Sequence, residues 1–161
     1  MVLLVGALTD VPDAAARLLH LLGDRLLDAG PVGAGAALKV GVNVMSYAQF
    51  SAAAAAFDLV ERNGADSDTL IEAWRHIGQL GRLTESYVSL LSLPDDVVSG
   101  PMRAYLAANA EIARKDLDLA AELARSGSGL HSVIAALGEA VPEVFRVGES
   151  SSQDDKGGQD G

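Results

Sequence analysis

One lysine and one asparagine stand four residues apart at the start of a long segment that is otherwise almost wholly apolar. They are Lys39 and Asn43, in the pattern Gly33-x-Gly35-x-x-x-Lys39-x-x-x-Asn43. On a helix this spacing places both side chains on one face, one turn apart. An unpaired ammonium group is too costly to bury, so Lys39 must reach a partner, a ligand or solvent. Lysines in such surroundings suit proton transfer, but a simpler interpretation is a lysine that extends to the surface, with Asn43 bonded to a neighbouring backbone group.

A second polar element follows downstream, at Lys115-Asp116-Leu117-Asp118-Leu119-Ala120. Considered alone, Lys115 is explained as a solvated helix cation that pairs with Glu111 or Asp118. Together the two elements resemble the signatures of the beta-hydroxyacid dehydrogenases, the family of 3-hydroxyisobutyrate dehydrogenase and tartronate semialdehyde reductase. They stand in the family's order, and the resemblance covers most of residues 1–148.

The resemblance implies an oxidoreductase that uses NAD or NADP and acts on the CH–OH group of a small 3-hydroxyacid. It assigns roles to three pairs of residues: catalysis to Lys39 and Asn43, cofactor binding to Lys115 and Asp116, and close approach of the backbone to substrate to Gly33 and Gly35. Lys39 would be the general acid and base. Asn43 would orient either the substrate oxygens or the lysine. The related imine reductases typically have an acidic residue or a tyrosine at this lysine position, so Lys39 argues against them.

Parts of the family pattern are absent from this sequence. The dinucleotide-binding motif, a strand followed by Gly-x-Gly-x-x-Gly, is not found. The most similar segment begins at Gly33, but Leu38 occupies its third glycine position. The family's serine- and glycine-rich substrate loop is missing, and Ala108 stands where an aromatic residue is common. The sequence therefore resembles the carboxyl-terminal helical domain of such an enzyme, and we expect no hydride transfer from this chain alone. The alternative function is a non-catalytic helical dimerisation module.

Composition sets the limits of other functions. The 161 residues are 49% hydrophobic, contain no cysteine and carry a formal net charge of −10. The acidic balance disfavours nucleic acid and anionic membranes as partners. Without cysteine there are no disulfides or thiolate metal sites, and the three histidines are too far apart for a local metal motif. No signal peptide is evident, and polar residues interrupt the apolar segment 40–60, so we expect a cytoplasmic protein that does not cross a membrane.

The pattern predicts a mainly α fold, a helical bundle around one long central helix. The resemblance likens it to the carboxyl-terminal domain of 6-phosphogluconate dehydrogenase, preceded by a short βαβ remnant of a Rossmann domain. The expected domains are residues 1–30, the end piece of a nucleotide-binding domain; residues 31–147, the helical domain; and residues 148–161, a disordered acidic tail.

Individual elements are predicted from apolar spacing and from cap and breaker residues. We expect strands at 2–5 and 25–28. The first expected helix starts within 10–13 and runs to about 22, and a later one is capped by 66–68 and runs to 77. The other helices are expected at 36–63, 83–91, 102–125 and 130–140. The helix at 36–63 is apolar nearly all round, so it must be surrounded by other helices or form a subunit interface. A homodimer or higher homo-oligomer is therefore expected.

Overall fold

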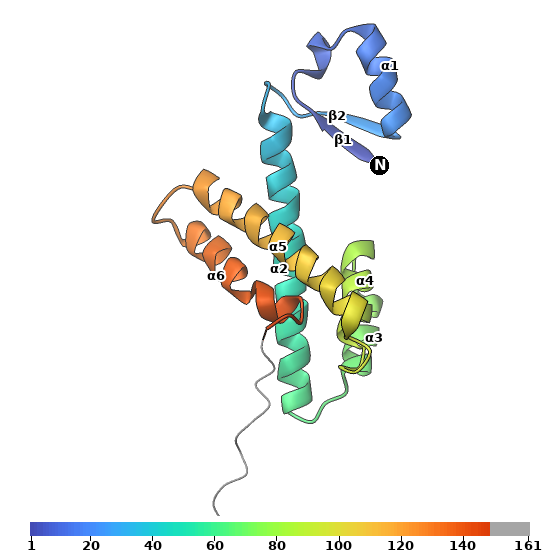
Figure 1. Cartoon of the computed structure of the whole chain (residues 1–161), viewed down its shortest axis with the longest axis vertical. Helices are drawn as coiled ribbons and strands as arrows, with labels where there is room; N and C mark the ends of the chain where they lie inside the picture. The colour runs from blue at the N-terminus through green and yellow to red at the C-terminus, as the bar shows by residue number, and fades with distance from the viewer. Residues whose placement is uncertain (149–161) are drawn as a thin grey trace, which may run out of the picture.

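The computed structural model describes residues 1–148 and is mainly helical, with a two-stranded parallel sheet near its amino terminus (Figure 1). Its elements are β1 (Val2–Val5), a 3-10 turn η1 (Leu8–Asp10), α1 (Asp13–Leu22), β2 (Arg25–Asp28), α2 (Ala34–Arg62), α3 (Ser67–Ile77), α4 (Arg82–Leu91), α5 (Gly100–Leu123) and α6 (Gly129–Val144). The mainly α architecture is confirmed. Apart from residue 148, the predicted tail lies outside the described residues.

The first three regular elements form a small βαβ unit. β1 pairs in parallel with β2, from Val2 opposite Arg25 to Val5 opposite Asp28. Pro12 precedes α1 and Gly23 follows it, as the sequence predicts for a helix with proline at its start and glycine at its end. This βαβ unit, residues 1–30, lies at the amino-terminal end of α2, apart from α3–α6 (Figure 1). A two-stranded sheet is marginally stable alone, so its packing on α2 supports it.

The central element is α2, whose 29 residues span about 43 Å at 1.5 Å per residue. Helices α3–α6 gather around its carboxyl-terminal half, where Phe50, Ala53 and Phe57 are buried (Figure 1). Of the two alternatives expected for this helix, burial by other helices of the chain holds for its carboxyl-terminal half, and an interface stays a prediction for the other half. Leu38, Val42 and Met45, in the amino-terminal half, are 47%, 54% and 60% exposed. The apolar pattern extends further along α2 than the bundle that covers it.

The core contains small and branched aliphatic residues with a few aromatic rings. Its buried members are Phe50, Ala53, Phe57, Ile71, Tyr87, Val88, Ala110, Ala113, Leu117, Val141, Val144 and Phe145. The rings of Phe50 and Tyr87 stack with centroids 4.3 Å apart, joining α2 to α4. Ala113 is fully buried on α5, and its small side chain permits close helix approach.

Local signals explain most helix ends. Asp66 caps α3 by accepting hydrogen bonds from the backbone N–H groups of Asp68 and Thr69. α6 continues four residues beyond its predicted end at 140 and contains Pro142. Proline removes one backbone donor there, but burial of Val141 and Val144 in the core favours continuation of the helix.

No helix among residues 1–148 is both long and apolar enough to span a bilayer.

Candidate functional site

The two sequence elements meet where α2 and α5 pack together. The side-chain amide of Asn43 donates a hydrogen bond from Nδ2 to Oδ2 of Asp116, 2.7 Å away, although the two residues are 73 positions apart in the chain. Lys39 Nζ donates to Asn43 Oδ1 at 2.8 Å. The amide of Asn43 therefore connects an ammonium group on one side to a carboxylate on the other.

Tyr47 is a further member that the sequence analysis did not identify. Its hydroxyl donates to the same Oδ2 of Asp116 at 3.1 Å. The sequence did contain a signal for it, because Lys39, Asn43 and Tyr47 follow one another at intervals of four and so share one face of α2. We refer to Lys39, Asn43, Tyr47 and Asp116 as the polar network.

The polar network runs from the surface toward the core. Lys39 is exposed, whereas Asn43, Tyr47 and Asp116 are half-buried. The ring of Tyr47 makes edge-on contacts with two core rings, Phe50 at 6.4 Å and Phe145 at 6.5 Å between centroids.

The phenol of Tyr47 keeps its proton at neutral pH. Burial, then the hydrogen bond to Asp116 and the negative charge of that carboxylate, together raise the pKa of Tyr47 to about 12. Tyr47 is therefore a stable hydrogen-bond donor to Asp116. It is poorly suited to releasing a proton near pH 7.

Lys39 lies at the surface, as the simpler interpretation of the sequence predicts. Its neighbours Leu38 and Val42 are themselves exposed, and the amine is at the surface. Lys39 therefore reaches solvent, and its hydrogen bond to Asn43 gives it a polar partner as well. Of the two roles expected for Asn43, the one present in this structure is the contact with the lysine.

The two motif glycines have structural reasons that do not involve a ligand. Gly33 precedes α2 with a φ of 91°, a backbone conformation that residues other than glycine rarely adopt. A Cβ on Gly35 would lie 2.6 Å from the carbonyl oxygen of Leu4, so the first turn of α2 can approach β1 only with glycine there. These requirements account for both glycines, and their assignment to a substrate loop remains a prediction.

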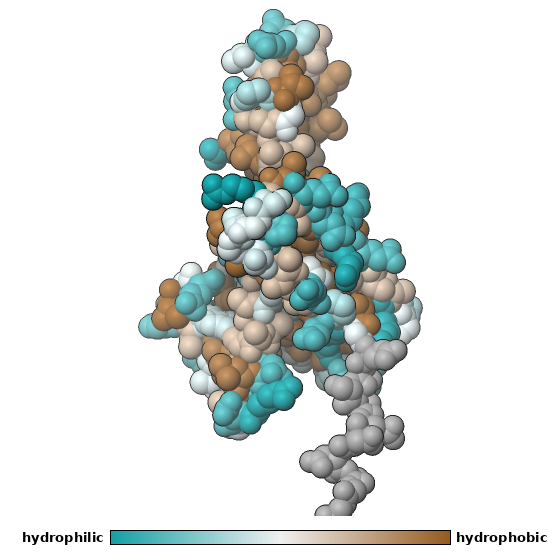
Figure 2. Space-filling view, turned by 90° about the vertical axis from the view of Figure 1, so that its left-hand side faces the viewer, coloured by the Kyte–Doolittle hydropathy of each residue, from teal (hydrophilic) through white to brown (hydrophobic). Residues whose placement is uncertain are grey.

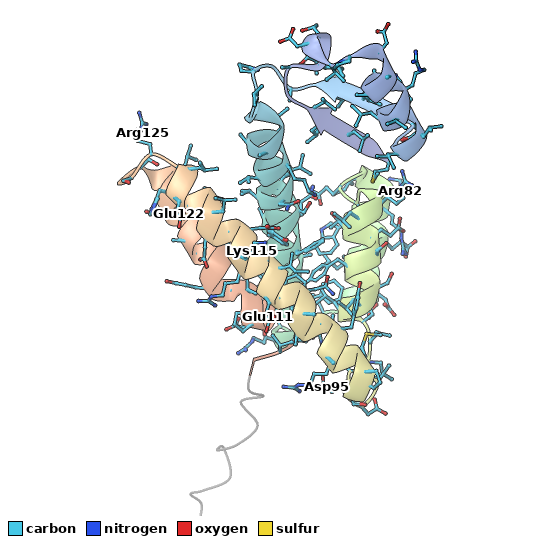
Figure 3. All side chains as sticks on the ribbon, turned by 45° about the horizontal axis from the view of Figure 1, so that its top comes forward. Arg82, Asp95, Glu111, Lys115, Glu122 and Arg125 are labelled. Atoms are coloured by element: carbon cyan, nitrogen blue, oxygen red, sulfur yellow. The ribbon has the colours of Figure 1, made fainter. Side chains whose placement is uncertain are left out.

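The two residues that the resemblance assigns to cofactor binding lie in different surroundings. Lys115 is exposed on α5 (Figure 3), and within the described chain it forms no ion pair with Glu111 or Asp118. The carboxylate of Asp116 instead contacts Asn43 and Tyr47 on α2. Lys115 therefore remains an available cation for an anionic group, whereas Asp116 belongs to the polar network.

A cavity of about 550 Å³ lies away from the polar network, between the carboxyl-terminal half of α2 and α6. Its charged lining includes Asp58, Glu61, Arg62, Glu143 and Arg146. Much of this charge is already paired. Arg62 bonds to Asp58, and Arg146 bonds to Asp95 and to two carbonyl oxygens, one at the end of α4 and one in the α4–α5 connection. The cavity therefore offers no evident catalytic arrangement.

Neither a metal nor a known relative adds to this geometry. Residues 1–148 contain no group of three or more histidine, aspartate or glutamate side chains placed to hold a metal ion. Comparison of the chain with protein-family models, curated proteins and solved structures finds no match.

Proposed function

We propose that the chain is the helical domain of an NAD(P)-dependent 3-hydroxyacid oxidoreductase, with Lys39 as the general acid and base. The observation that carries this proposal is the hydrogen bond between Asn43 and Asp116, which brings the two motifs together at one place. Sequence spacing alone accounts for the pair Lys39 and Asn43. It does not require that the second motif lie beside them.

In this proposal the chain supplies proton transfer and part of the binding surface. Lys39 Nζ would give a proton to the alkoxide oxygen of the product during reduction, or take the hydroxyl proton of the substrate during oxidation. Asn43 would hold Nζ in place through its Oδ1. Lys115 would attract an anionic group of the cofactor or substrate. A bound nicotinamide would supply or accept the hydride.

The described residues fit only one part of such a site. An exposed amine beside a half-buried network can meet a hydroxyl or carbonyl group, and Lys115 adds one cation. β1 is followed by Gly6-Ala7-Leu8, which is not the glycine-rich turn that holds a dinucleotide. The proposal therefore requires a nucleotide-binding domain, supplied by another segment or another chain.

A second candidate is a non-catalytic helical module that forms a homodimer or a higher homo-oligomer. The observation that favours it is apolar exposure on both helices that carry the motifs. The exposed side chains are Leu38, Val42 and Met45 on α2 and Ile112, Leu119 and Leu123 on α5. Figure 2 shows further apolar residues at the surface of the projecting end of the molecule. Exposed apolar surface of this kind marks association sites.

Sedimentation equilibrium combined with calorimetric titration of NAD and NADP tests both candidates. Under the enzyme proposal, the chain binds the cofactor weakly, and Lys115→Ala removes that binding. Arg114→Ala is the matched control, because it removes a neighbouring positive charge on α5 outside the motif. A stable oligomer with no heat of binding would favour the association module. Turnover of a 3-hydroxyacid by the purified chain alone would contradict the need for a second domain.

A further inference from the structure

We propose that Asp116 is a positioning residue, which fixes the orientation of the Asn43 amide so that its oxygen holds the ammonium group of Lys39. Tyr47 supports it by fixing Asp116. This inference rests on the proposed function for the catalytic role of Lys39, but the positioning itself is independent of any cofactor or substrate.

The first step of the argument is that the two ends of the Asn43 amide are not interchangeable. Nδ2 faces the carboxylate of Asp116 at 2.7 Å, and Oδ1 faces the ammonium of Lys39 at 2.8 Å. Turning the amide over would place Oδ1 against a carboxylate and the NH₂ group against an ammonium. Both contacts would then be repulsive, and two charge-assisted hydrogen bonds would be lost. The opposite charges therefore select one orientation.

The second step is that Asp116 is itself held in place. Its Oδ2 accepts two hydrogen bonds, from Asn43 Nδ2 and from the Tyr47 hydroxyl. Tyr47 in turn is fixed by ring contacts with Phe50 and Phe145 in the core. Next to Asp116 on α5, Leu117 is buried with 2% exposure, which sets the rotation of that helix. The position of an exposed amine is thus determined by packed residues.

This arrangement assigns Asn43 a definite role. One lone pair of its oxygen and one of its two N–H bonds are already used within the protein, which leaves one N–H and one lone pair for a ligand. Asn43 therefore orients Lys39, and binding of substrate oxygens is secondary. The lysine is held at the crossing of α2 and α5 before any substrate arrives, which reduces the cost of ordering it during catalysis.

The test uses two measurements on the full chain. The sequence contains only three lysines and three asparagines, so individual side chains can be followed. The first measurement is the side-chain amide signal of Asn43 in ¹⁵N-labelled protein. The second is the rate of acylation of Lys39 relative to Lys115, determined by peptide mass spectrometry. In Asp116→Ala the Asn43 signal should shift, and the relative acylation rate of Lys39 should rise roughly two- to fivefold, the effect of losing one hydrogen bond.

Matched variants separate positioning from general loosening of the fold. Asp118→Asn, an exposed change on the same helix, should leave both measurements unchanged. Asn43→Ala removes the link directly and should give the full rise in Lys39 acylation. If Asp116→Ala folds and gives the wild-type ratio while Asn43→Ala raises it, the role of Asp116 is refuted. If Asp116→Ala does not fold, Asp116→Asn decides: a ratio between wild type and Asn43→Ala supports the proposal, and a wild-type ratio overturns it.

Failure of the proposed function would look different. Neither measurement involves hydride transfer, so the positioning result stands on its own. If the amide signal and acylation rate respond as expected, but the chain together with a dinucleotide-binding domain never binds NAD or NADP, then the dehydrogenase proposal fails and the positioning inference survives.

Discussion

Replacing Asp116 with asparagine should lower the pKa of the Tyr47 phenol, which is about 12 in the native fold against an ordinary value of 10. Three causes raise this pKa: burial, which is the largest, then the hydrogen bond to Asp116 and the negative charge of Asp116. Asparagine keeps an acceptor oxygen and leaves the burial unchanged, but it removes the charge. We therefore expect the pKa to fall by up to about one unit and to remain above 10.

The assay is a spectrophotometric titration of tyrosinate absorbance. Subtracting the titration of Tyr47→Phe isolates Tyr47 from Tyr87, whose pKa is also raised by burial. The same titration in the Asp116→Asn background gives the shift. Asp118→Asn serves as the control, because it removes a carboxylate from α5 without touching the network.

The raised pKa also predicts how stability depends on pH. Because the folded-state pKa of Tyr47 lies above its unfolded value, its contribution is fully present below pH 10 and is lost as the pH rises through 12. A difference of about two units corresponds to at most about 2.7 kcal/mol, and solvent access to the half-buried ring reduces the expected loss to about 1 kcal/mol. Urea unfolding should therefore show the stability gap between the native chain and Tyr47→Phe narrowing above pH 10.

A titration in which Tyr47 ionises at the same pH with and without the Asp116 carboxylate would refute the electrostatic reasoning. It would mean that burial alone sets the pKa and that the hydroxyl does not face Oδ2 of Asp116. An unchanged stability gap between pH 9 and pH 11 would contradict the raised folded-state pKa itself.

Three further predictions concern the scaffold that positions the network. Gly35→Ala should destabilise the contact of α2 with β1 by about 1–3 kcal/mol, because the new Cβ would lie 2.6 Å from the Leu4 carbonyl oxygen. Gly41→Ala should instead stabilise α2 by about 0.5–1 kcal/mol, because no atom lies within 4 Å of the new Cβ. Hydrogen exchange of the strand amides distinguishes the two variants. Asp66→Ala should destabilise α3 more than Asp66→Asn, because asparagine can still cap the helix. Since the Asp66 pKa is lowered in the fold, the stability lost in Asp66→Ala, measured by urea unfolding, should become smaller as the pH falls below about 4. Leu106→Ala should cost about 2–5 kcal/mol in thermal or urea unfolding, because Leu106 is only 2% exposed.

Local signals in the sequence were sufficient to predict the elements that carry the site. The βαβ unit, α2 and the cap at Asp66 all follow from residue spacing and from proline, glycine or aspartate at helix ends. The hydrogen bond between Lys39 and Asn43 also follows, since residues four apart on a helix are neighbours. Each of these features depends on residues close together in the chain.

The partner of Asn43 could not be predicted in the same way. Lys115 and Asp116 are consecutive, and consecutive residues on a helix point about 100° apart, so the rotation of α5 decides which of them faces α2. That rotation is set by burial of Ala113 and Leu117 against distant parts of the chain. The family resemblance implies cofactor binding for both residues, which stays a prediction, and the packing turns Asp116 toward Asn43.

The exposed half of α2 connects the two candidate functions. Leu38 and Val42 flank Lys39 in sequence, and all three are exposed. A partner that covers these two apolar side chains would also remove water from the amine, and desolvation favours the uncharged form of a lysine, which is the form that accepts a proton. Under the enzyme proposal, association and proton transfer would therefore not be independent in this chain. If the enzyme proposal is correct, substitutions such as Val42→Glu that weaken association should also weaken catalysis by the assembled enzyme, although residue 42 takes no part in the chemistry.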